Sequence, residues 1–178
     1  MRCGMHLGGR RIGRRIGRSI YGRVAGLKNR LVRARYFRGH GVHSPFVYAI
    51  VRQVFMRHDL LPGDRELYGA LCAAGVGHRR AVQLQNLFIH CGYHTFAMNR
   101  TGVDLCVVGR SLPEEEVLAL VDQARRCGTT LVLLEPYADE ERCRLCRRIV
   151  AAHGCTSVDN RAYLLIFNNY LPKQHFRI

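Results

Sequence analysis

Hydrophobic periodicity predicts that the second half of the chain alternates strands with helices. Short apolar runs are separated by segments in which apolar residues recur every three or four positions. The run TLVLLE is apolar almost throughout, as in a parallel strand that helices cover on both faces. Strands are predicted at 94–98, 104–108, 130–135, 155–159 and 162–169, with helices at 112–127 and 138–153. The order is that of an α/β domain.

The last two predicted strands are joined by a turn at Asp159-Asn160-Arg161. A parallel crossover needs a dozen or more residues, so this pair must form an antiparallel hairpin. The final residues, PKQHFRI, place Lys173, His175 and Arg177 on one face of another possible strand. That cationic face could bind phosphate, but protection of a sheet edge is favoured.

Helical periodicity also precedes these strands. Helices are predicted at 45–57, 64–74 and 78–91. Ser44 is a good N-cap for the first of them, and Pro45 suits the first helical position because its missing N–H would have no intrahelical partner. Asp64 can cap the second helix. Ser111 and Glu114 have the spacing of a capping box at the start of the helix at 112–127.

Two sequence blocks carry a family resemblance, GHGVHSPFVY before the first core helix and LPKQHFRI at the end. Together with the element order, they resemble bacterial class I S-adenosylmethionine-dependent methyltransferase-like proteins over residues 36–178. The resemblance implies an α/β, Rossmann-like mixed sheet with an antiparallel carboxy-terminal hairpin, preceded by helices. The sheet should be truncated, because the segment ahead of the strand at 104–108 is too short for the two strands, helix and cofactor loop that the family places there.

The missing part is the part that would bind the cofactor. In that family, a glycine-rich loop follows the first strand, and an acid that ends the second strand holds the ribose of S-adenosylmethionine. Only about a dozen residues separate the helix that ends near Cys91 from the strand at Asp104. Gly75 and Gly77 superficially resemble such a loop, but they follow a helical segment instead of a strand. No cofactor is therefore expected, unless the family activity is retained and S-adenosylmethionine binds.

Charge is concentrated at the amino-terminal end. Residues 1–58 contain thirteen arginines, one lysine and no acid, whereas residues 59–178 are nearly neutral, with a net charge of +1. Residues 1–35 are predicted to form a basic arm, amphipathic or disordered, ahead of the domain at 36–178. The Arg-rich stretch 10–38 is expected to attract nucleic acid or an acidic membrane surface.

No apolar run is long enough for a membrane-spanning helix, and no signal peptide is recognisable. We therefore expect a cytoplasmic protein, which could associate peripherally with a membrane. Its eight cysteines are expected to be reduced thiols. Cys143 and Cys146, with His153 and Cys155 downstream, could be drawn as a zinc site. Structural zinc pairs usually lie in turns, whereas this segment is helical, so core thiols are favoured and no metal is expected.

The candidate site at the start of the first core helix consists of Arg38, His40, His43 and Ser44. These residues would lie at the positive end of that helix, where an anion can bind, although helix capping alone also explains Ser44. No catalytic or cofactor-binding residue can be assigned. The leading hypothesis is a degenerate methyltransferase-like protein that acts as a non-catalytic scaffold. One alternative is an active enzyme whose cofactor site is incomplete or completed in a homodimer. The other is nucleic-acid binding through the arm.

Overall fold

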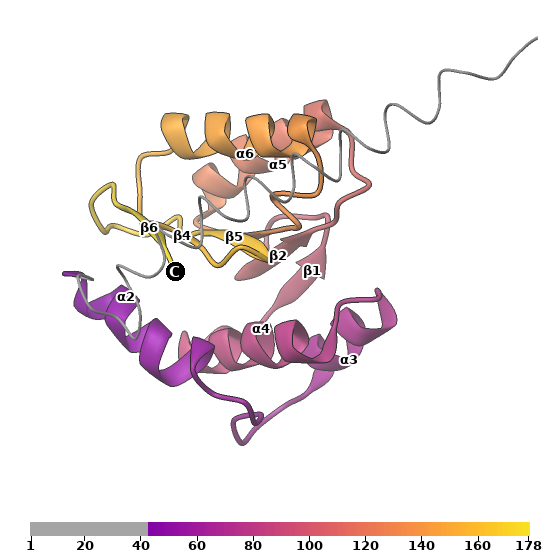
Figure 1. The fold of residues 1–178 in the computed structure, drawn as a ribbon, viewed down its shortest axis with the longest axis vertical. Coiled ribbons are helices and arrows are strands. Elements are labelled where there is room, and N and C mark those ends of the chain that lie inside the picture. The colour runs from indigo at the N-terminus through magenta and orange to yellow at the C-terminus, as the bar shows by residue number, and fades with distance from the viewer. Residues whose placement is uncertain (1–42) are drawn as a thin grey trace, which may run out of the picture.

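A mixed β-sheet lies between two helical layers in the computed structural model, which describes residues 43–178 (Figure 1). The described strands are β1 (Phe96–Met98), β2 (Leu105–Val108), β3 (Thr130–Leu134), β4 (Ser157–Asp159), β5 (Tyr163–Ile166) and β6 (His175–Arg177). The described helices are α2 (Pro45–Ile50), η2 (Val51–Phe55), α3 (Glu66–Ala73), α4 (His78–His90), α5 (Glu114–Cys127) and α6 (Glu140–Ala152). The predicted arm at 1–35 lies outside the described residues.

The six described strands have the order β1-β2-β3-β5-β4-β6. β1, β2 and β3 are parallel neighbours, and β5 runs antiparallel to both β3 and β4. The predicted carboxy-terminal hairpin is thereby confirmed. β6 pairs in parallel with β4 and forms one edge of the sheet.

Each face of the sheet has its own hydrophobic core. Helices α2, η2, α3 and α4 cover one face, and α5 and α6 cover the other (Figure 1). Alternate strand residues serve the two layers: Val107 belongs to the first core and Cys106 to the second. Phe46 packs edge-on against Phe167 at a ring-centroid distance of 5.0 Å, which holds α2 against the end of β5. This contact fixes α2 beside the carboxyl end of β5.

The helix predicted over 45–57 changes type partway along. Ser44 is its N-cap, as predicted, and Val51 begins a π-helix in which the Met56 N–H donates to the Val51 carbonyl at 3.1 Å. Apolar spacing did not distinguish the two helix types here, because the short apolar run around Val51 and Val54 also suits an α-helix. The capping box predicted at Ser111 was wrong: Pro113 is the N-cap of α5, and no side chain caps that end.

The connection between β1 and β2 is unusually short for two parallel neighbours. It consists of residues 99–104 and contains no helix. Asp104 closes this loop, because its carboxylate accepts hydrogen bonds from the His94 and Thr95 amides, both at 2.8 Å. These bonds lower the pKa of Asp104. Among residues 43–178, no helix is long and apolar enough to cross a membrane.

Candidate functional site

The structure describes only part of the anion site predicted from the sequence. Arg38 and His40 lie outside the described residues. Ser44 is buried and its hydroxyl accepts a hydrogen bond from the Val47 amide at 3.4 Å, whereas His43 is exposed. The Ser44 side chain is therefore committed to capping α2. Because α2 has only six residues, we assign no ligand to its amino-terminal end.

A larger opening lies at the carboxyl ends of β2 and β3, where open α/β sheets usually bind ligands. We call it the strand-end cavity. Its volume is about 610 Å³, within the range of small-molecule sites. Three segments form most of its wall: the turn between α3 and α4, the residues that follow β2 and β3, and the turn between β4 and β5. The lining residues are Ala74, Gly75, Val76, Gly77, Arg80, Arg110, Leu134, Glu135, Tyr137, Ala138, Arg161, Ala162 and Tyr163.

The lining of the strand-end cavity is positively charged. Three arginines and one carboxylate contribute a formal charge of +2. Arg110 is paired with Glu135 at 3.4 Å and with Asp139 at 3.7 Å. By contrast, no hydrogen bond or ion pair among the described residues engages the guanidinium groups of Arg80 and Arg161. Within residues 43–178, the cavity therefore holds two cations without an ion-pair partner, one on α4 and one in the β4–β5 turn.

A further arginine lies at the same strand ends. Arg142, on α6, is only 6% exposed, and its guanidinium donates to the carbonyls of Gly109 and Leu134, both at 3.3 Å. Its Nε has no hydrogen-bond partner, and no ion pair within residues 43–178 neutralises it. A buried charge without a counterion is costly. Arg142 therefore adds strong positive potential at the ends of β2 and β3.

Residues with an uncommon backbone conformation lie at the same end of the sheet as the strand-end cavity. In the described chain, the non-glycine residues with positive φ are Asn99, Glu135 and Arg161, at 54°, 49° and 57°. Asn99 directly follows β1, and the other two line the strand-end cavity. The left-handed region costs an L-residue about 1–2 kcal/mol, and such residues concentrate at functional sites. The strained backbone thus coincides with the charged cavity.

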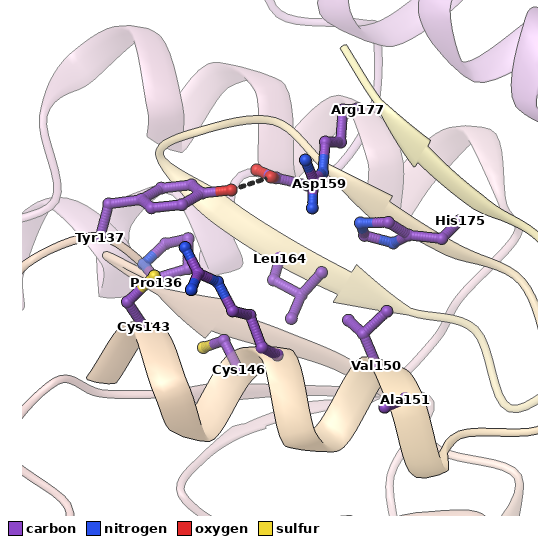
Figure 2. Close-up of a pocket in the computed structure, with 11 residues that line it drawn as sticks. Pro136, Tyr137, Cys143, Cys146, Val150, Ala151, Asp159, Leu164, His175 and Arg177 are labelled. Carbon is purple, nitrogen blue, oxygen red and sulfur yellow. Dashed lines mark hydrogen bonds between the residues drawn. The ribbon is translucent and has the colours of Figure 1, made fainter. Parts of the chain in front are cut away.

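A second cavity, of about 390 Å³, lies between α6 and strands β4, β5 and β6 (Figure 2). We call it the α6 cavity. Figure 2 shows the Tyr137 hydroxyl directed at the carboxylate of Asp159, to which it donates a hydrogen bond. Asp159 is buried and also accepts from the Arg161 amide at 2.7 Å. His175 and Arg177 on β6 line the same cavity, so the cationic face predicted at the sheet edge is turned partly inward.

Neither Cys146, which lines the α6 cavity, nor the nearby Ser157 is an activated nucleophile. Burial raises the pKa of Cys146 to about 12, so this group is a neutral thiol near pH 7. Ser157 is 2% exposed, and its hydroxyl lies 2.9 Å from Nδ1 of His175, its cross-strand neighbour. Desolvation lowers the pKa of His175, with a further lowering from Arg177 and an opposing rise from Asp159. A serine this buried cannot reach a substrate, and the pair is explained by strand register.

Metal binding has no support in the described part of the chain. There, no group of three or more His, Cys, Asp or Glu residues is arranged to hold a metal ion. Cys143 and Cys146 are buried on α6 and free, in agreement with the predicted core thiols, whereas Cys72 and Cys127 are exposed. Helical spacing alone did not separate these two groups.

Sequence reasoning missed the strand-end cavity, although each of its parts was visible. Gly75 and Gly77 follow a helix, as predicted, which excluded a cofactor loop after a strand. Their turn nevertheless lines the cavity, because α4 packs on one face of the sheet and begins beside the ends of the strands. Arg80 and Arg161 are 81 positions apart and carry no motif. Comparison with protein-family models, curated proteins and solved structures gives no match for the chain.

Proposed function

We propose that the chain is a degenerate methyltransferase-like protein that carries out no methyl transfer and acts as a binding or scaffold protein. The observation that carries this proposal is the six-residue connection between β1 and β2. In the family that the sequence resembles, this is where the cofactor loop, its helix and the acid-bearing strand would be placed. Residues 99–104 leave no room for them.

The charge at the strand ends supports the same proposal. S-adenosylmethionine carries a sulfonium and an ammonium against one carboxylate, so it is a net cation near pH 7. Arg110 follows β2 and is one of the residues that give the strand-end cavity its formal charge of +2. Glu135 is the one carboxylate in the lining, and it is paired with Arg110. These residues do not fit S-adenosylmethionine.

Isothermal titration of the full chain with S-adenosylmethionine and S-adenosylhomocysteine tests the proposal. We expect no saturable heat with either compound up to about 1 mM, a concentration that would reveal even weak specific binding. Micromolar binding of both compounds would overturn the proposal. A stoichiometry of one ligand per two chains would favour the alternative, an active enzyme with a cofactor site completed in a homodimer.

A further inference from the structure

We propose that the strand-end cavity binds a small ligand through a phosphate or diphosphate group. This inference rests on the proposed binding role and specifies the ligand class. Its first support is the pair Arg80 and Arg161, which line the cavity and whose guanidinium groups have no hydrogen-bond or ion-pair partner among residues 43–178. Guanidinium groups present several donors in a plane, which matches the oxygens of a phosphate.

Arg142 supplies independent support from inside the protein. Its buried guanidinium touches the carbonyls that end β2 and β3, and no carboxylate within residues 43–178 pairs with it. Buried charges are usually paired, since an unpaired one loses its hydration without compensation. An anion held in the adjacent cavity would offset the positive potential that Arg142 creates there.

The turn between α3 and α4 fits the same ligand. Gly75 has a φ of 80°, Gly77 is the N-cap of α4, and no side chain caps this 13-residue helix. An added Cβ on either glycine would meet nothing within 4 Å, so the turn faces open space. Uncapped amides at a helix start favour an anion. The turn therefore adds backbone amide donors to the side-chain donors of the arginines.

A phosphate fits the charge better than a monocarboxylate does. Arg110 is already paired with two carboxylates, which leaves Arg80 and Arg161 as the two cations to be neutralised at the cavity surface. A phosphate carries close to two negative charges near pH 7 and can accept from both side chains. A volume of about 610 Å³ leaves space for an organic group attached to the phosphate.

The test is a titration of the full chain with inorganic pyrophosphate, followed by calorimetry and by the NMR amide signals of Gly75 and Gly77. We expect saturable binding that shifts both signals. The double variant R80Q/R161Q should bind at least tenfold more weakly, because two charge-assisted contacts are lost. R161Q alone should have an intermediate effect, and since Arg161 is exposed, this variant should keep the native fold.

The matched control is R126Q/R144Q. It removes the same charge from exposed positions on α5 and α6, away from the strand-end cavity, and should bind pyrophosphate like the unmodified chain. Equal weakening in both double variants would show non-specific attraction to a basic protein and would overturn the inference. So would unshifted Gly75 and Gly77 signals or the absence of saturation. Binding of pyrophosphate without S-adenosylmethionine supports both proposals, and binding of S-adenosylmethionine alone contradicts both.

Discussion

A buried polar network holds the turn that carries Arg161. The Tyr163 hydroxyl donates to Oε1 of Gln83 at 3.1 Å and accepts from the side-chain amide Nδ2 of Asn160 at 2.8 Å. Gln83 also donates to the Phe55 carbonyl at 3.1 Å, so α4, η2 and the β4–β5 turn are joined through one glutamine. Desolvation of the fully buried Tyr163 raises its pKa, which keeps the hydroxyl neutral and able to donate. The network positions one wall of the strand-end cavity.

The substitution Tyr163→Phe should lower the free energy of unfolding by about 1–2 kcal/mol, because it leaves buried hydrogen-bonding groups without a partner while it preserves the ring. Urea unfolding followed by circular dichroism measures the change. Tyr48→Phe removes a hydroxyl from a side chain that is 46% exposed and should change stability by less than about 0.5 kcal/mol. Equal effects of the two substitutions would show that the Gln83 network contributes nothing.

The buried His153 should make the free energy of unfolding depend on pH. It is 4% exposed at the end of α6, and desolvation lowers its pKa; Arg125 and Lys173 lower it further, while a hydrogen bond to the Phe167 backbone partly opposes them. The unfolded chain takes up a proton near pH 6.5, whereas folded His153 resists it. The contribution of His153 to stability is therefore complete above pH 6.5 and decreases as the pH falls towards the folded pKa.

Urea midpoints at pH 7.5 and pH 5.5 measure this contribution. The unmodified chain should lose stability between these two values, and His153→Gln should lose less, because the titrating group is gone. His58→Gln, at an exposed position, is the control and should keep the full pH dependence. An unchanged slope in the His153 variant would assign the effect to other groups, of which His175, whose pKa is also lowered, is the first to examine.

At the scale of elements, two helix glycines have different backbone conformations, and alanine should have opposite effects on stability at the two positions. Gly128 ends α5 with a φ of 72°, a conformation that favours glycine, whereas Gly69 lies inside α3 with open space around it. Gly128→Ala should destabilise the protein by about 1–2 kcal/mol, and Gly69→Ala should stabilise it by about 0.5–1 kcal/mol. Thermal unfolding of the two variants should therefore shift the melting temperature in opposite directions. A common sign would contradict the assigned backbone conformations.

Elements were predictable from the sequence to the extent that local patterns define them. The run TLVLLE predicted β3 because a continuous apolar run is typical of a strand buried on both faces. The Asp159-Asn160-Arg161 turn predicted the β4–β5 hairpin because three residues are too few for a parallel crossover. The π-helix was not predictable, because its apolar spacing also suits an α-helix. The strand-end cavity was not predictable either, because its cations meet only through sheet order and helix packing. Residue types alone do not reveal that Arg80 and Arg161 line the same cavity.

At the scale of the whole molecule, the unequal charge distribution separates two kinds of anion binding. The strand-end cavity is a defined site, whereas the cations of the predicted basic arm, residues 1–35, are spread along the sequence and should contact phosphates of a polymer without reading sequence. Binding to a nucleic acid through the basic arm should therefore weaken steeply with salt. Binding at the cavity should be saturable and should depend on Arg80 and Arg161 instead.

Replacement of three arm arginines tests this separation in the full chain. R11Q/R14Q/R15Q should weaken binding to a short DNA duplex and reduce the slope of log K against log salt by about 2–3, since each lost phosphate contact contributes about 0.9. R65Q/R126Q/R144Q removes equal charge from exposed positions of the folded part and should leave that slope nearly unchanged. Equal slopes in the two triple variants would exclude the arm as the DNA-binding segment. Pyrophosphate affinity should be the same in both, because neither variant alters Arg80 or Arg161, and a selective loss in the arm variant would place the arm at the cavity.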